Sequence, residues 1–167
     1  MNRLPLLGIY KRKEYFSVWD NVKKQVELEL EQLHLLLQTY HLLRAKCEST
    51  NPDLVEIMAL GAMLHSFYTG IENIFSRIAK GIDDSMPSGK FWHSSLLEKM
   101  SIAVPQRPAV LSLPLQELLD EYLDFRHVFR QAYSFQLQWE KMSHLVFSIE
   151  NTLEQLEIEL KNFFLMD

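Results

Sequence analysis

Apolar residues recur at alternating three- and four-residue steps from Trp139 to Phe163, without a single break. This spacing places them along one side of an α-helix, in the heptad pattern of helices that pack against other helices. We therefore predict a helix from about Gln138 to Phe164. Two arrangements would bury this seam: antiparallel packing within a helical bundle, or a coiled coil between two copies of the chain.

The rest of the chain has the same helical spacing, interrupted by a few breaks. We predict four more helices, which run from Ser17 to about Lys46, from an N-cap at Asn51 to about Lys80, from Ser94 or Ser95 to about Val104, and from Pro114 through the segment 124–133. Residues 1–13 are expected to form a loose N-terminal arm of a single domain, 1–167. The predicted fold is all-α, an antiparallel bundle of four long helices and one short helix.

Two features of the helix predicted from Asn51 to Lys80, and of the loop after it, call for an explanation. Gly61 and Gly70 lie inside this helix, where each costs roughly 1 kcal/mol relative to alanine. Close approach by another helix would account for them. Asp83 and Asp84 follow the helix and precede a proline and a glycine, a pattern typical of a solvated turn rather than of a metal site.

The composition excludes several classes of protein. The chain of 167 residues is 47% hydrophobic and has a net charge of −5, so neither disorder nor nucleic-acid binding through the overall field is expected. Any contact with RNA must come from a local patch. Cys47 is the only cysteine, which excludes an intrachain disulfide and a cysteine-based zinc site. No uninterrupted apolar stretch approaches about 18 residues, and we predict a cytoplasmic protein with no membrane contact, metal or cofactor.

One charged side chain falls on the apolar face of its own helix. At about 100° per residue, Arg126 shares one stripe with Leu115, Leu118, Leu119, Tyr122, Phe129 and Tyr133. A guanidinium in that place must be paired, must line a wet cleft, or must extend its charged end to the surface. Glu72 lies at the edge of another apolar stripe and is a candidate partner for Arg126. The alternative for Glu72 is an ordinary exposed position.

The segment around Arg126 also resembles a known motif. Arg126-His127-x-Phe129-Arg130-x-x-Tyr133 is similar to the signature of HepT-like proteins, all-helical toxins of the HEPN superfamily that are encoded beside a minimal nucleotidyltransferase antitoxin. In that signature an Arg is followed, after four to six residues, by a His, and a Tyr lies two positions after the His. Phe67-Tyr68-x-x-Ile71-Glu72 and Trp92-His93-x-x-Leu96-Leu97 extend the similarity, which covers about residues 60–145.

The resemblance implies a HEPN-like homodimer with the 124–133 segment at its cleft, and RNA cleavage without a metal or cofactor. It implies catalytic roles for Arg126, for the residue at the motif His position, and for Tyr133. It also implies a nucleotidyltransferase partner, which in some pairs of the family adenylylates the motif tyrosine, a position that Tyr133 matches. The motif His position is occupied by Gln131, which cannot transfer a proton near neutral pH. The loss of general acid–base catalysis typically costs roughly 10²–10⁴-fold in rate.

His127 and Arg130 are the further candidates for this site. On a straight helix, His127 and Gln131 lie about 100° and 140° from Arg126. The helix must therefore bend or end near Gln131, or the cleft must be broad.

Three interpretations follow. The first is a HepT-like ribonuclease toxin that is inactive or weakened because of Gln131. The second is a non-catalytic dimeric binding subunit for a nucleotidyltransferase, with Tyr133 as the adenylylation target. The third is a helical bundle without either role, in which Arg126 forms only a buried ion pair.

Overall fold

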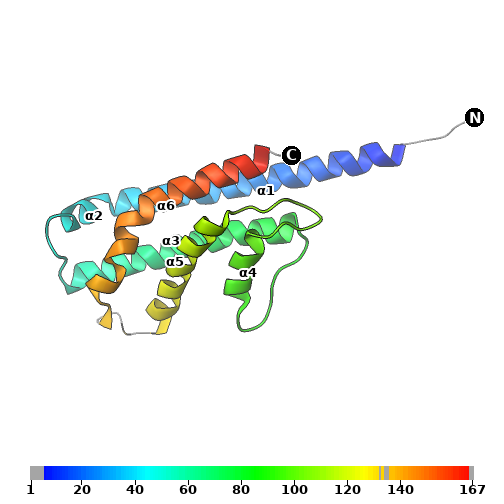
Figure 1. Ribbon diagram of the computed structural model, residues 1–167. Helices are drawn as coiled ribbons and strands as arrows, with labels where there is room; N and C mark the ends of the chain where they lie inside the picture. Colours follow the sequence, from blue (N-terminus) through cyan, green and yellow to red (C-terminus); the bar gives the residue numbers. More distant parts are fainter. Residues whose placement is uncertain (1–5, 132, 134–135, 166–167) are drawn as a thin grey trace, which may run out of the picture.

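The computed structural model describes residues 6–131, 133 and 136–165, and the side chains of these residues from position 18 onward. Figure 1 shows the six helices of this part of the chain, which are α1 (Leu6–Thr39), α2 (His41–Cys47), α3 (Leu54–Gly81), α4 (Trp92–Met100), α5 (Leu113–Gln131) and α6 (Trp139–Leu165). The predicted all-α class is confirmed, and α1, α3, α5 and α6 are its four long helices. α2 is a second short helix that was not predicted.

The first helix differs from the prediction at both ends. α1 begins at Leu6, so residues 6–13 of the expected arm are helical, while residues 1–5 lie outside the described residues. The helix predicted to reach Lys46 is interrupted by a turn at Tyr40, after which α2 continues to Cys47. The chain therefore changes direction slightly before the loop that leads to α3 (Figure 1).

The start of α3 also differs, because its N-cap is Asp53 and not Asn51. The Asp53 side chain accepts a hydrogen bond of 2.9 Å from the Glu56 backbone N–H, and the Glu56 side chain accepts one of 3.0 Å from the Asp53 backbone N–H. This reciprocal capping box satisfies two backbone donors at once. α4 begins at Trp92 and ends at Met100, which is earlier at both ends than predicted.

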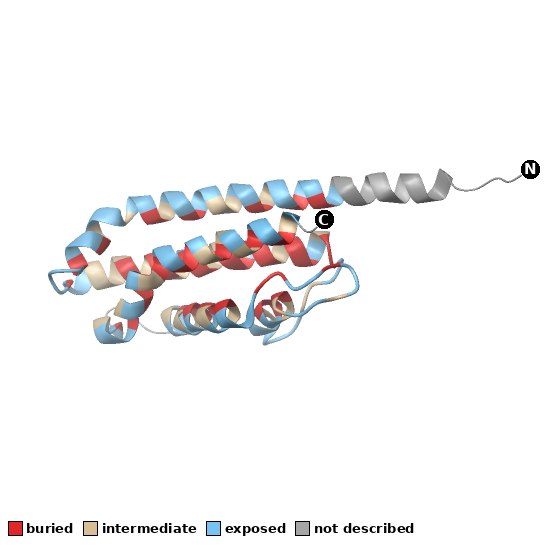
Figure 2. Cartoon of the chain, turned by 45° about the horizontal axis from the view of Figure 1, so that its top comes forward, coloured by how far each residue is buried: buried red, intermediate tan, exposed pale blue. Residues whose placement is uncertain are grey.

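α3 lies at the centre of the fold and contacts α1, α4, α5 and α6. Figure 2 shows buried residues along the bundle where the helices face one another. Within the described part of the chain, α3 is the one helix long and apolar enough to cross a membrane by length and composition alone. Its burial among four other helices explains that apolar character, because a core helix must be apolar on more than one face.

Glycines allow α1 to approach α3 closely. A Cβ atom at Gly70 would lie 2.6 Å from Cδ2 of Leu33, and one at Gly81 would lie 2.3 Å from Cγ2 of Val22. The explanation predicted for Gly70, a close helix approach, is therefore confirmed. Because the earlier residue of α1 meets the later residue of α3, the two helices run antiparallel.

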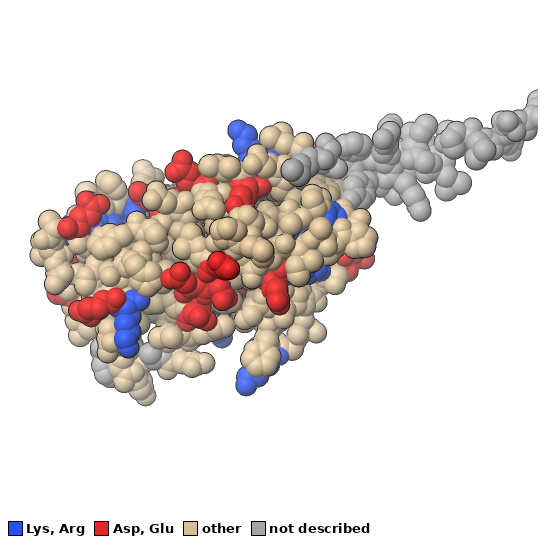
Figure 3. Space-filling view, viewed as in Figure 1, with Lys and Arg blue, Asp and Glu red and all other residues tan. Residues whose placement is uncertain are grey.

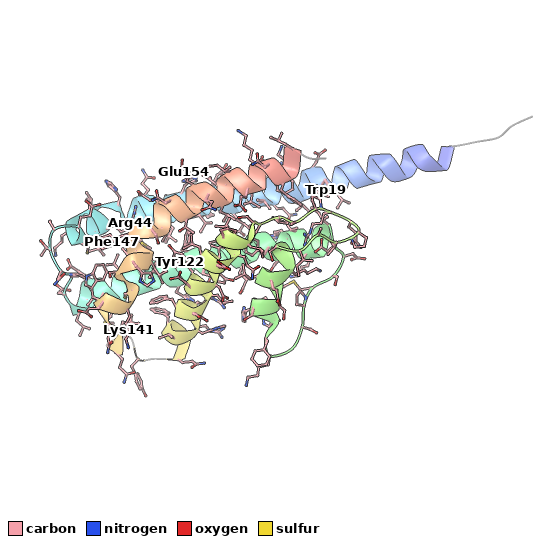
Figure 4. All side chains as sticks on the ribbon, viewed as in Figure 1. Trp19, Arg44, Tyr122, Lys141, Phe147 and Glu154 are labelled. Atoms are coloured by element: carbon pink, nitrogen blue, oxygen red, sulfur yellow. The ribbon has the colours of Figure 1, made fainter. Side chains whose placement is uncertain are left out.

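The apolar seam of α6 is buried inside the chain's own bundle, which confirms antiparallel packing over a coiled coil between copies. Trp19 of α1 packs against Phe163 near the C-terminal end of α6, with ring centroids 5.2 Å apart. Tyr122 of α5 lies between α5 and α6 (Figure 4), and its hydroxyl donates a 2.9 Å hydrogen bond to the carbonyl of Leu145. The first contact holds α1 against α6, and the second holds α5 against α6.

The Asp83-Asp84 turn was expected to be solvated, and for Asp83 this prediction was wrong. Asp84 is exposed with a φ of 47°, whereas the Asp83 side chain is buried. Arg107 donates two hydrogen bonds to its carboxylate, from Nε at 2.7 Å and from Nη2 at 3.0 Å, and Lys99 Nζ lies 3.1 Å away. The ion pair ties the end of α3 to the segment between α4 and α5.

Candidate functional site

Glu72 is buried on α3 at the place where α4 and α5 meet it. Arg126 of α5 has its Nη2 atom 3.4 Å from Glu72 Oε1, and His93 of α4 contacts Glu72 Oε2 through Nδ1. The three side chains are between 9% and 13% exposed, so water screens their charges only weakly. Arg126 is therefore paired in the interior. Of the two alternatives predicted for Glu72, the structure shows the partner of Arg126 and not the exposed residue.

The hydrogen-bond pattern around His93 decides which ring nitrogen carries a proton. Nδ1 lies close to both Glu72 Oε2 and Arg126 Nη1, the latter at 3.2 Å. A guanidinium can only donate, so Nδ1 cannot donate to it. The carboxylate of Glu72 is the shorter contact and can only accept, so Nδ1–H donates a hydrogen bond to it. Nε2 is then the unprotonated nitrogen of the neutral ring.

A pocket of about 450 Å³ opens beside this buried cluster. We call it the basic pocket, and the residues that line it are Lys90, Phe91, His93, His127, Arg130 and Gln131. None of these residues is acidic. Four other pockets of the described chain each contain at least one glutamate, and Figure 3 shows several groups of acidic side chains on the face in view. The basic pocket is thus a local cationic site on an acidic protein.

An aromatic ring stands at the edge of the basic pocket. Phe91 is 71% exposed, and Lys90 Nζ lies 5.5 Å from the centre of its ring. The Trp92 ring packs against that of His93 at a tilt of 30°, with ring centroids 3.7 Å apart. An exposed ring beside cations is the combination that proteins use to bind single-stranded nucleic acids, because a base stacks on the ring while the cations contact phosphates.

The residues predicted for the site are only partly brought together. His127, Arg130 and Gln131 line the basic pocket, and α5 ends at Gln131, as one of the predicted alternatives required. Arg126 is not among the lining residues, because Glu72 and His93 hold it behind the pocket. Tyr133 was expected on the apolar stripe, and this was wrong: it lies past the end of α5 and is 72% exposed.

His93 is the residue of the site that the sequence analysis did not assign. It lies in one of the segments that carry the family resemblance, but the sequence alone predicts no chemical role for it. Its ring centroid lies 6.0 Å from that of His127, which belongs to a different helix. Helical periodicity relates residues within one helix only, so the pairing of α4 with α5 was needed to find it.

His65 of α3 stacks against Phe129 of α5, with ring centroids 5.1 Å apart. Burial lowers the pKa of His65 below its ordinary value of 6.5, and the charges of Arg126 and Arg130 lower the pKa further. Because the folded pKa is the lower one, the stability from neutral His65 is fully present above about pH 6.5 and is lost as the pH falls through the folded pKa.

We expect a variant His65→Phe, which keeps an aromatic ring against Phe129, to be less sensitive to acid. The free energy of unfolding, measured by urea titration at about pH 7.5 and 5.5, should fall less on acidification in this variant than in the native protein. His144→Gln, which removes an exposed histidine, is the control. An equal reduction in acid sensitivity in the control would mean that burial of His65 is not the cause.

A comparison with known protein families identifies the same region of the chain. A family model described as HepT-like protein matches residues 59–166, which include Glu72, His93 and the whole of α5 and α6. No curated protein and no solved structure matches the chain.

Proposed function

The chain belongs to the HepT-like family, and from this premise we propose that it is the toxin component of a toxin–antitoxin pair, directed at RNA and weakened as a ribonuclease by Gln131. The observation that carries the proposal is the acid-free pocket lined by His93, His127, Arg130 and Gln131. It supplies a local cationic surface on a chain whose net charge is −5.

RNA cleavage without a metal needs two things from the protein. A titratable group must move protons between the ribose 2′-hydroxyl and the leaving oxygen, and a fixed positive charge must stabilise the phosphate as negative charge develops. Arg130 and Lys90 provide charge at the pocket, with Arg126 behind it. Gln131 occupies the family's proton-transfer position without a titratable group, so weak activity is the expectation.

The same proposal includes partners and location. We infer a homodimer with the 124–133 segment at its cleft, a minimal nucleotidyltransferase as antitoxin, and a cytoplasmic protein without cofactor. Tyr133 is 72% exposed and lies beyond the end of α5, a position accessible to a modifying enzyme. This exposure favours a second candidate function, a non-catalytic binding subunit for the nucleotidyltransferase in which Tyr133 is adenylylated.

Restoring histidine at position 131 tests the first function. Expression of Gln131→His is expected to arrest growth and degrade RNA, because a proton-transfer group returns to the cationic pocket. Co-expression of the neighbouring nucleotidyltransferase should relieve the arrest. The measurements are growth curves and electrophoresis of total RNA.

Gln138→His is the matched control, since Gln138 is exposed and does not line the basic pocket. It should leave growth unchanged. If expression of Gln131→His also leaves growth unchanged and the total RNA of the cells intact, the toxin function is contradicted and the binding-subunit function is favoured. Incubation with the nucleotidyltransferase and ATP should then increase the mass of the protein by one adenylyl group, and Tyr133→Phe should prevent the increase.

A further inference from the structure

Glu72 and His93 form a carboxylate–histidine pair in which the carboxylate orients the ring. The Glu72 side chain is 9% exposed and accepts a hydrogen bond from Nδ1–H of His93, so Nε2 of the neutral ring has a free lone pair. Among the described residues, nothing hydrogen-bonds to Nε2, and His93 lines the basic pocket. A ring oriented in this way presents a proton acceptor to whatever the pocket binds.

The charged and titratable groups around His93 come from three parts of the fold. Glu72 faces it from α3, Arg126, His127 and Arg130 from α5, and Lys90 from the segment before α4. Glu72 stabilises the imidazolium that forms when Nε2 accepts a proton, while the cations oppose it. The carboxylate thus places a stabilising negative charge next to the ring that would accept the proton, as in a histidine that acts as a general base.

His127 supplies a second titratable group on the same pocket. Its ring centroid lies 6.0 Å from that of His93, and it comes from α5 rather than α4. Two histidines on one pocket allow one to accept a proton while the other donates one, which is what transfer of an RNA phosphodiester to its own 2′-oxygen requires.

We propose that His93, oriented by Glu72, is the general base for RNA cleavage in this chain and replaces the group absent at Gln131, with His127 as the general acid. This inference rests on the proposed function. In the step, His93 Nε2 takes the 2′-hydroxyl proton and the 2′-oxygen bonds to phosphorus. The bond from phosphorus to the 5′-oxygen breaks, and that oxygen takes a proton from the His127 imidazolium. The products are a 2′,3′-cyclic phosphate and a 5′-hydroxyl, and no water or metal is consumed.

The test uses the purified full-length protein and a fluorescein-labelled single-stranded RNA of mixed sequence, with the same strand carrying 2′-O-methyl riboses as the substrate control. Native protein should cleave the first strand slowly and the second not at all. His93→Gln should lower the rate by about 10²-fold or more, while His144→Gln, an exposed histidine outside the basic pocket, should leave it unchanged.

Two further readouts separate catalysis from a merely structural role. The native rate should fall on acidification, because a protonated base cannot accept the 2′-hydroxyl proton, and His93→Gln should lose this dependence. Added imidazole should restore part of the rate in His93→Ala. Circular dichroism checks that each variant remains helical. If neither His93 variant folds, the pH dependence of the native rate and the effect of His127→Gln on that rate test the proposal instead.

The failure of this inference is distinguishable from failure of the proposed function. Equal rates for the native protein and a folded His93→Gln variant would overturn the role of His93. Cleavage by Gln131→His but not by the native protein would also overturn it and would leave the proposed function standing. Cleavage by neither protein would overturn both.

Discussion

Replacing Asp83 with asparagine is expected to lower the free energy of unfolding by about 3–5 kcal/mol. Asp83 is 2% exposed, and Arg107, whose side chain is fully buried, donates two hydrogen bonds to its carboxylate. The remaining donors of Arg107 go to the carbonyls of Ile102, Pro108 and Lys99 at 3.0 to 3.2 Å. Loss of the carboxylate charge leaves this guanidinium buried without a counter-ion.

The neighbouring residue provides a matched control. Asp84→Asn removes one carboxylate from the adjacent, exposed position and keeps a residue that tolerates the positive φ of 47°. Its effect should stay within about 0.5 kcal/mol. Urea titrations of both variants give the comparison. Equal effects at the two positions would contradict the idea that the buried ion pair holds the 101–112 segment against the end of α3.

Replacing Glu72 with glutamine is expected to cost a similar amount, about 3–5 kcal/mol. Arg126 is 9% exposed, its Nε atom is buried without a hydrogen-bond partner, and Glu72 is the one carboxylate paired with it in the described structure. Neutralising Glu72 leaves that guanidinium uncompensated. Glu117→Gln, at an exposed position on α5, serves as the control and should change stability by no more than about 0.5 kcal/mol.

A double-mutant cycle measures how strongly the two side chains are coupled. Arg126→Met should cost less than Glu72→Gln, because Glu72 keeps its contact with His93. The double variant should be more stable than the sum of the single effects predicts. If Glu72→Gln leaves stability unchanged, Arg126 is already solvated through the pocket and available to a ligand. A strong coupling instead assigns Arg126 to holding His93 and α5 in place.

The cycle bears on the interpretation in which Arg126 is only a structural ion pair. The ion pair with Glu72 is present, yet it lies directly behind a pocket that carries two histidines and two cations. A structural role for Arg126 and a chemical role for the pocket are therefore compatible. Membership of the HepT-like family favours the interpretations in which this region has a function.

The sequence determined those features that depend on residues close together in the chain. The helices, the buried seam of α6 and the grouping of His127, Arg130 and Gln131 follow from a repeat of about 3.6 residues. The substitution of Gln131 for a proton-transfer residue was also visible from the motif alone. Helix ends were placed less well, because a reciprocal cap such as Asp53 with Glu56 competes with other plausible caps nearby.

Tertiary structure decided everything that depends on contacts between helices. It buried Asp83 against Arg107, placed Arg126 behind the pocket, and brought His93 of α4 beside Glu72 of α3 and His127 of α5. The physical reason is that periodicity fixes the direction of a side chain relative to its own helix axis only. Which helix faces it depends on how the packed helices share one core. That arrangement made His93, which lies between two predicted helices, part of the candidate site.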